Sequence, residues 1–292
     1  MDKEHFRVTV HCEVIIKKAT TQQTKILVFF LDRLHVLSQP GGNAKLPHQL
    51  ERCVPFLDLR RIRVPETNAC RIEFGVASPD GSVGDGLQFS CSLENDCAKI
   101  VAHVTACLRM HLPQVGNRLV EVSLPNRWML EVLIAELGTS LVQSQAISDK
   151  CGHFASAYDL YSSYLGVTAQ PEIKWDVDTI YFSQGTHTFC LRDFSDSKQE
   201  EFSAVLGALA FNDYFNGLDC SGVRLSDSFI LAHQSSTLEK LNLARCGLLM
   251  KRLNRCFELL TDRLIGFQSL PLRHLCIDGC GGLGGSGMGG GV

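Results

Sequence analysis

The sequence predicts an α+β unit, a helical segment and an α/β unit built from repeats, in that order along the chain. Short β-rich runs with alternating apolar residues fill most of the first 91 residues, which indicates a sheet. The apolar period then changes to three and four, which indicates a helix. Near the C-terminus a leucine-rich pattern recurs, which indicates stacked strand–helix repeats.

The composition is that of a folded protein with more than one domain. The chain has 292 residues, of which 45% are hydrophobic and 20% are charged, close to the averages of globular proteins. Its formal net charge of −3 argues against a polycation that binds nucleic acid. No apolar run approaches the about 18 residues of a membrane span. Met1 leads into no secretory signal, so the 13 cysteines are expected to remain reduced in the cytosol.

The N-terminal part, residues 5–112, is expected to form a small antiparallel sheet closed by one helix. Apolar residues repeat at spacings of three and four from Cys97 to Leu108, with Ser92 as the expected N-cap and Pro113 ending the helix. Six or seven such strands followed by a helix are the layout of a pleckstrin-homology-like barrel, whose open end the helix would plug. The strands are expected at residues 8–16, 25–31, 34–37, 56–64, 70–76 and 87–91.

Residues 113–172 are expected to form a helical linker. One apolar segment follows Pro125 and contains Trp128, Leu130 and Ile134. A second runs from Phe154 and is closed by a glycine, a typical helix C-terminal signal. Its aromatic residues are expected to pack on neighbouring elements and not to bind a cofactor.

The most specific signal is a repeat over residues 173–280. Its template is L-x-x-L-x-L-x-x-N/C-x-L, the pattern of leucine-rich repeats. One stretch matches all five positions, a second matches four, and two others fit more loosely, which predicts a truncated solenoid of about four strands. The matching residues are Leu238, Leu241, Leu243, Cys246 and Leu248, then Leu272, Leu275, Ile277 and Cys280, then Phe215, Leu218, Cys220 and Leu225, and, for the strand part alone, Val177, Ile180 and Phe182.

The physics of a strand explains the template. Leu241 and Leu243 are two apart, so both point from a short strand into the core, and Cys246 would lie buried just beyond it. Each repeat must stack on a neighbour because it cannot cover its own apolar face. Helices are expected over residues 202–210 and 248–264. Residues 281–292 are glycine-rich and expected to be disordered, so the chain is interpreted as truncated or as divergent at its terminus.

A basic cluster is the candidate membrane contact. Lys17, Lys18 and Lys25 flank the expected first hairpin loop, and Lys45 lies in the expected loop between the third and fourth strands. Lysines near an anionic leaflet contribute about 1 kcal/mol each, so these four predict weak attachment to acidic phospholipid. The final arginine of the usual phosphoinositide signature is missing after Lys25, so lipid recognition is expected to be non-specific. The alternative is a solvated cluster of surface charges.

No catalytic residue, metal ligand set or cofactor site is expected. His103 and Cys107 could meet on one face of the helix, but a structural zinc site takes four ligands, so core packing is favoured. Asp176 and Asp178 beside Trp175 could be an acid–base pair, but a cap on the first repeat strand is favoured. Because no nucleophile motif is present either, the chain is expected not to be an enzyme.

The residues that open the repeat region resemble a known family. The sequence IKWDVDTIYFSQ at residues 173–184 closely resembles the segment that opens the leucine-rich repeats of the CARMIL proteins, and LRDFS at 191–195 continues the match. Residues 151–154 and 164–166 resemble that family's helical linker, and residues 98–109 resemble the end of its pleckstrin-homology domain. The resemblance covers roughly residues 5–280.

The resemblance implies a scaffold of the actin cytoskeleton. CARMIL proteins are capping-protein regulators and myosin-I linkers, so it implies actin capping protein as a partner and myosin-I as a possible one. It also implies a peripheral position at the plasma membrane, in lamellipodia and cell migration. In the family, capping protein binds a basic segment beyond the repeats, and dimerisation uses later repeats. Neither is found in these residues, so a homodimer is expected only of a longer protein.

Two alternatives stay open. A generic cytosolic leucine-rich-repeat adaptor would bind a protein along its concave strands and have no actin role. A small enzyme has no motif in its support.

Overall fold

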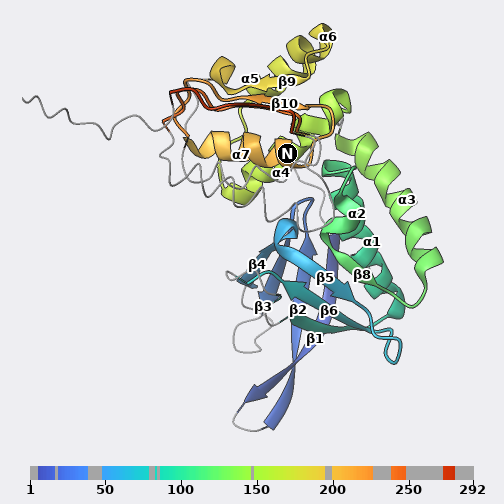
Figure 1. Ribbon diagram of the computed structural model, residues 1–292. Coiled ribbons are helices and arrows are strands. Elements are labelled where there is room, and N and C mark those ends of the chain that lie inside the picture. Colours follow the sequence, from blue (N-terminus) through green and yellow to red (C-terminus); the bar gives the residue numbers. More distant parts are fainter. Residues whose placement is uncertain are drawn as a thin grey trace, which may run out of the picture. The chain divides into compact units, whose positions relative to one another are not determined.

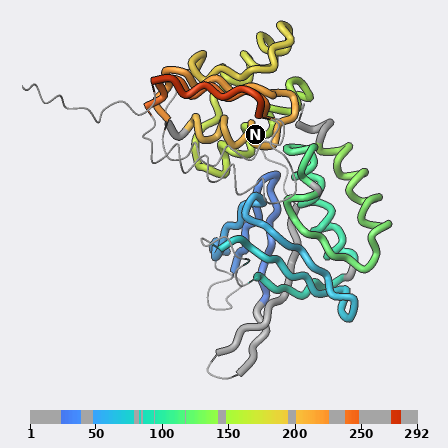
Figure 2. Tube along the Cα trace, viewed as in Figure 1, coloured from blue at the N-terminus to red at the C-terminus, as the bar shows by residue number. Residues whose placement is uncertain are grey.

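The computed structural model describes residues 6–16, 19–38, 48–78, 83, 86–145, 148–194, 199–225, 238–247 and 272–279. Its contacts divide the chain into two compact units, Met1–Ile147 and Ser148–Val292, each of which is described by itself. The path of the described backbone is traced in Figure 2. The division falls inside the expected linker, and the linker boundaries stay a prediction. No helix of the described residues is long and apolar enough to cross a bilayer.

The N-terminal unit is built on an eight-stranded sheet with helices beside it (Figure 1). The strand order is β4-β3-β2-β1-β7-β6-β5-β8, and every pair is antiparallel except β5 with β8. The chain is mixed α and β, as expected, but no described pairing joins β4 to β5, so closure into a barrel stays a prediction. The strands are β1 Phe6–Ile16, β2 Ala19–Phe29, β3 Arg33–Ser38, β4 Gln49–Pro55, β5 Leu59–Arg63, β6 Arg71–Val76, β7 Leu87–Cys91 and β8 Glu121–Ser123.

Two of these strands have no counterpart among the expected elements. In β4 only Val54 is buried, so the strand shows no apolar alternation. Strand β8 has three residues and pairs in parallel with β5, which lies far from it in sequence. The expected strand at residues 56–64 begins instead with a single 3-10 turn, η2 (Phe56–Asp58), followed by β5. Both missed strands lie at the ends of the sheet order.

Helix α1 (Glu94–His111) supplies the centre of this unit's core. The five apolar residues that predict it are at most 1% exposed, and the opposite side of the helix is buried too, at Ala102 and Ala106. Helix α3 (Arg127–Gln145) covers that second side, which is why α1 is apolar nearly all round. The expected cap at Ser92 is wrong: the N-cap is Leu93, and no side chain caps the helix. The five residues are Cys97, Ile100, Val101, Val104 and Leu108.

The C-terminal unit contains a parallel sheet whose strands follow one another in chain order. Helix α7 (Gln199–Ala210) connects the first two and packs on α4 (Phe154–Leu165). Leu241, Leu243 and Cys246 are between 0 and 3% exposed. The strands are β9 Thr188–Cys190, β10 Gly217–Asp219, β11 Lys240–Asn242 and β12 His274–Cys276. Short helical elements precede and follow β9: η3 Lys150–His153, α5 Pro171–Asp176, η4 Val177–Tyr181, α6 Phe182–Gln184 and η5 Leu191–Phe194.

The expected first repeat strand at Val177, Ile180 and Phe182 is wrong. These residues lie in a continuous helical run formed by α5, η4 and α6, in which η4 is a π turn. Ile180 and Phe182 are 38% and 48% exposed. Asp176 and Asp178 therefore belong to this helical run and do not cap a strand. The first strand of the sheet is β9, which places buried Phe189 in the core.

The outermost described strand leaves apolar residues half-exposed. Leu275 and Ile277, two of the expected core residues, are 41% and 38% exposed, and Leu272 is partly exposed. Strand β12 pairs with β11 on one side and with no other described strand. Leu238 is also partly buried. Leu248, Cys280, the expected helix at 248–264 and the glycine-rich tail at 281–292 lie outside the described residues.

Candidate interaction surfaces

The structure gives a position to one of the four lysines expected at the membrane. Lys25 lies within β2, where it is 6% exposed and forms an ion pair with Glu51 of β4. The hairpin ladder extends β2 back to Ala19, so Lys25 does not flank the hairpin loop. Its charge is matched by that carboxylate and serves the packing of the sheet. Lys17, Lys18 and Lys45 lie outside the described residues, and their lipid contact stays a prediction.

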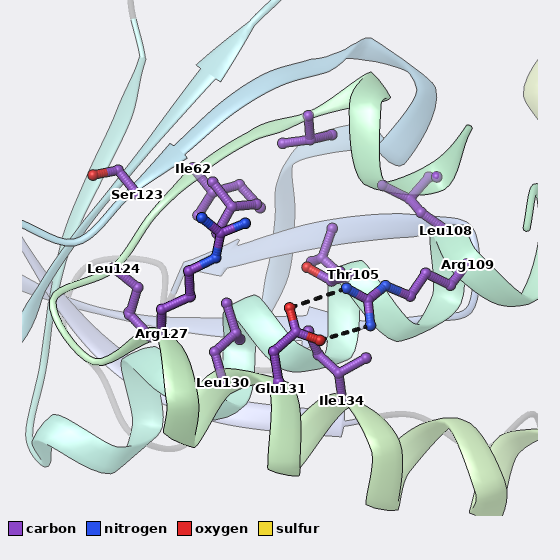
Figure 3. A pocket seen from close by; sticks show the side chains of 14 residues that line it. Ile62, Thr105, Leu108, Arg109, Ser123, Leu124, Arg127, Leu130, Glu131 and Ile134 are labelled. Atoms are coloured by element: carbon purple, nitrogen blue, oxygen red, sulfur yellow. Dashed lines mark hydrogen bonds and ion pairs between the residues drawn. The ribbon is translucent and has the colours of Figure 1, made fainter. Parts of the chain in front are cut away.

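A cavity of about 420 Å³ opens between α1, α3 and β8 in the N-terminal unit (Figure 3). Val104 and Leu108 of α1 and Leu130 and Ile134 of α3 supply apolar walls. These residues are buried because the two helices pack against each other over the sheet. No sequence pattern groups these residues as a site, since each follows ordinary helical periodicity.

An ion pair spans the two helices at this cavity. Arg109 donates from Nη1 to Oε2 of Glu131 at 3.1 Å and from Nη2 to Oε1 at 3.2 Å. The hydrogen bonds from Arg109 lower the pKa of the Glu131 carboxyl, and the positive charges of Arg109 and Arg127 lower it further. Because Glu131 is half-exposed, the pair fixes geometry more than it stabilises the fold. Sequence offers one faint signal here, the i, i+4 spacing of Arg127 and Glu131.

The expected meeting of His103 and Cys107 is confirmed. Cys107 Sγ lies 3.5 Å from His103 Nε2, which also lies 3.1 Å from the carbonyl oxygen of Phe30. Burial lowers the pKa of His103 and raises the pKa of the Cys107 thiol, so both groups are held neutral. No cluster of three or more metal-binding side chains occurs among the described residues. The pair therefore belongs to the core.

The parallel sheet of the C-terminal unit carries a second hollow, of about 470 Å³. Its polar lining comes from neighbouring strands in register: Asp219 of β10, Lys240 and Asn242 of β11, and His274 of β12. Alternation along each strand sends Leu218 and Leu241 to the buried side. This face thus presents an acidic, a basic and an amide side chain in a shallow row. Such a row suits contact with a protein surface more than catalysis.

The helical run before β9 exposes a group of large apolar side chains. Trp175 is 59% exposed, and Ile180 and Phe182 lie on the same short run. The Nζ atom of Lys150 lies 5.3 Å from the centre of the Phe182 ring, a cation–π contact. Sequence reasoning missed this surface because it assigned Val177, Ile180 and Phe182 to a buried strand; Pro171 before the run and Gly185 after it are the signals that indicate a helix.

Several of the curated proteins similar to this chain share one family name. The mouse capping protein, Arp2/3 and myosin-I linker protein 2 is 29% identical over 265 residues, which are 88% of this chain and 19% of that protein. The mouse linker protein 3 is 27% identical over 233 residues, which are 77% of this chain and 16% of that protein. A more distant similarity, 20% identity over 250 residues, joins 82% of this chain to 20% of the Rho GTPase-activating protein gacW of Dictyostelium discoideum. No family model matches.

The chain spans less than a fifth of the length of the linker proteins that it matches. The aligned share of the chain is large enough to include residues of both structural units. This similarity agrees with the resemblance of residues 173–184, around Trp175, to the same family. Over most of its length the chain is similar to the CARMIL family, the capping protein, Arp2/3 and myosin-I linker proteins.

Proposed function

We propose that the chain is part of a non-enzymatic, membrane-associated scaffold that regulates actin filament capping and assembly. The observation that carries this proposal is the similarity to linker protein 2 over 88% of the chain. The name of that relative joins capping protein, Arp2/3 and myosin-I, which are components of one machinery. Capping protein and myosin-I are the partners proposed here, and homodimerisation is proposed for a longer protein that contains this chain.

Each of the two units is assigned one contact of such a scaffold. The strand order β4-β3-β2-β1-β7-β6-β5 followed by α1 supports a pleckstrin-homology-like fold for the N-terminal unit. The sequential parallel strands and the buried Leu241, Leu243 and Cys246 support a leucine-rich-repeat fold for the C-terminal unit. In this arrangement the first unit meets acidic phospholipid and the second meets protein.

The membrane contact is proposed for Lys17, Lys18 and Lys45. Lys25 is left out of it because its ammonium group pairs with Glu51 inside the sheet. Three lysines near an anionic leaflet give about 3 kcal/mol at low salt, so attachment is weak and falls as salt screens the charges. Peripheral, plasma-membrane localisation at lamellipodia follows from this contact together with the actin partners.

Vesicle sedimentation of the full chain tests the membrane contact. The chain should pellet with phosphatidylserine vesicles at low salt and should not pellet with phosphatidylcholine vesicles. The triple variant Lys17→Glu, Lys18→Glu, Lys45→Glu should remain in the supernatant. A charge-matched control, Arg52→Glu, Lys99→Glu, Arg118→Glu, reverses three charges elsewhere on the same unit and should still pellet. If both variants lost vesicle binding to the same extent, net charge alone would explain the binding and these three lysines would not form a specific contact.

Proximity labelling in migrating cells tests the actin role. The chain fused to a biotin ligase should label capping protein and myosin-I above the level of the ligase alone. Labelling that omits both would remove the actin proposal and leave the adaptor alternative.

That alternative is favoured by one observation, the mixed polar row over Asp219, Lys240 and His274. In an adaptor, Lys240→Glu would abolish partner capture and leave the vesicle result unchanged.

A further inference from the structure

We propose that Cys70 and Cys91 of the N-terminal unit form a reversible disulfide when a hydroperoxide oxidises Cys70. Cys70 precedes β6, Cys91 ends β7, and a third cysteine, Cys97, lies near the start of α1. All three thiols are free in the structure, as expected for a resting state in a reducing compartment. The site involves none of the lysines proposed to meet lipid, so it adds to the scaffold role and does not depend on it.

The backbone places Cys70 and Cys91 opposite each other on neighbouring segments. The ladder of β6 with β7 pairs Arg71 with Ser90. The N–H group of Cys91 donates to the carbonyl oxygen of Cys70 at 2.7 Å, which continues that ladder by one pair. Opposite residues project from the same face of a sheet, with Cβ atoms about 5 Å apart. A disulfide joins Cβ atoms about 4 Å apart, so a small displacement of the turn at Cys70 closes the bond.

Exposure assigns the first step to Cys70. This residue is partly exposed, whereas Cys91 and Cys97 are 5% and 1% exposed. A hydroperoxide dissolved in water therefore meets Cys70 first. The thiolate of Cys70 attacks one peroxide oxygen, so an S–O bond forms and the O–O bond breaks. With hydrogen peroxide, the departing hydroxide leaves as water with the proton of the thiol, and Cys70 becomes a sulfenic acid.

Cys91 completes the reaction from within the sheet. Its thiolate attacks the sulfur of the sulfenic acid, so an S–S bond forms and the S–O bond breaks. The oxygen leaves as a second water, with the proton that the Cys91 thiol has lost. In total the two thiols are oxidised to a disulfide and one hydrogen peroxide is reduced to two waters. Cys91 needs no contact with solvent for this step, because it attacks the residue opposite to it.

Cys97 is the positioning residue for this attack, because a thiolate and not a thiol is the attacking group. The hydrogen bond between the Cys91 and Cys97 side chains lowers the pKa of the Cys91 thiol, while burial and the charge of Asp96 act in the opposite direction. The same bond raises the pKa of Cys97, which therefore keeps its proton and donates it to the Cys91 sulfur. The three thiols do not form a metal site, since the described residues include no group of three or more side chains placed to hold a metal ion.

Peptide mapping of the full chain by mass spectrometry tests the disulfide. The protein is treated with a small molar excess of hydrogen peroxide, its remaining thiols are alkylated, and it is digested without reductant. We expect one cross-linked pair of peptides that contain Cys70 and Cys91, and the loss of this pair after treatment with dithiothreitol. Absence of the pair would overturn the proposal, as would a cross-link of either cysteine to Cys97 in its place.

Two substitutions separate this disulfide from general thiol oxidation. Cys91→Ser should leave Cys70 as a sulfenic acid that dimedone labels, because the attacking thiol is missing. Cys53→Ser is the matched control, since Cys53 is an exposed thiol on β4 of the same unit, and the cross-link should form as in the parent. Equal cross-linking of Cys70 in both variants would overturn the proposal. If Cys91→Ser fails to fold, the cross-link mapped in the parent still decides.

The role of Cys97 is tested by the balance between the two products. Cys97→Ala should shift the product from the cross-link to dimedone-labelled Cys70 at neutral pH, and the cross-link should return as the pH rises. Cys97→Ser keeps a hydrogen-bond donor and should restore the cross-link at neutral pH. A product balance and pH profile of Cys97→Ala equal to those of the parent would overturn the positioning role.

Discussion

The side-chain amide of Asn212 donates hydrogen bonds to the carbonyl oxygens of Cys151, at 2.8 Å, and of Gly152, at 3.0 Å. Its Oδ1 atom accepts from the backbone N–H groups of Tyr214 and Phe215 at 2.9 and 3.0 Å. One buried side chain thus joins the turn before α4 to the loop after α7. The joined turn is left-handed at three successive residues, with φ of 45° at Cys151, 66° at Gly152 and 61° at His153.

Asn212→Ala should lower the free energy of unfolding of the C-terminal unit by about 2–4 kcal/mol, because several buried backbone groups lose a partner at once. Urea denaturation of the full chain measures the change. Asn216→Ala is the matched control, since no hydrogen bond of the Asn216 side chain is described, and it should change stability little. A small effect of Asn212→Ala would show that water replaces the amide.

The left-handed turn predicts opposite signs for two substitutions. His153→Gly should stabilise the protein by up to about 1 kcal/mol, because glycine adopts positive φ without the penalty that a Cβ atom carries. Gly152→Ala should destabilise it, because the new Cβ would lie 3.0 Å from Asn212 Nδ2, Asp213 Oδ1 and Tyr214 Cβ at a φ of 66°. Thermal denaturation of both variants gives the comparison. A stabilising Gly152→Ala would contradict the described turn.

Two leucines at the same repeat position should differ sharply when truncated. Leu241→Ala should cost about 2–5 kcal/mol, the usual range for a buried leucine, because Leu241 is 3% exposed. Leu275→Ala should cost far less, because that side chain is 41% exposed. Chemical denaturation of the two variants measures the difference. Similar losses would mean that Leu275 is covered in solution, for example by a second copy of the chain.

The buried His103 predicts a dependence of stability on pH. Burial lowers its folded-state pKa below the unfolded value of about 6.5, so the folded protein takes up this proton less readily than the unfolded chain. The contribution of neutral His103 to the free energy of unfolding is complete above pH about 6.5. It is lost as the pH falls from there through the lowered folded-state pKa. His103→Gln should flatten that part of the profile. The measurement uses a Trp175→Phe background, in which Trp128 is the remaining tryptophan and its fluorescence reports unfolding of the N-terminal unit. If His103→Gln left the pH profile of stability unchanged, the assignment of this dependence to His103 would be contradicted.

Sequence patterns predicted those elements whose residues are buried in a regular period. Helix α1 followed from the spacing between Cys97 and Leu108, and β10 and β11 followed from the leucine template. Strand β4 could not be predicted, because Val54 is its one buried residue. The helical run at Ile180 was misassigned, because three apolar residues matched the strand part of the template; the signals of the helix are Pro171 at its start and Gly185 just after its end.

The candidate site was beyond prediction for a different reason. Arg109 and Glu131 lie on separate helices, and only the packing of α1 on α3 brings them within hydrogen-bonding distance. Nothing local to either residue indicates the other. The cavity is likewise a product of tertiary packing, since each wall residue is an ordinary apolar position of its own helix.

The exposure of Leu275 on β12 indicates where local unfolding of the C-terminal unit begins. A layer covered on one side alone has fewer contacts to lose, so opening should begin at β12 and move toward β9, where Phe189 is sealed beneath the preceding helical run. Amide exchange should therefore quicken strand by strand in the order β9, β10, β11, β12. Any additional layer docked on Leu275 would slow exchange at every strand behind it.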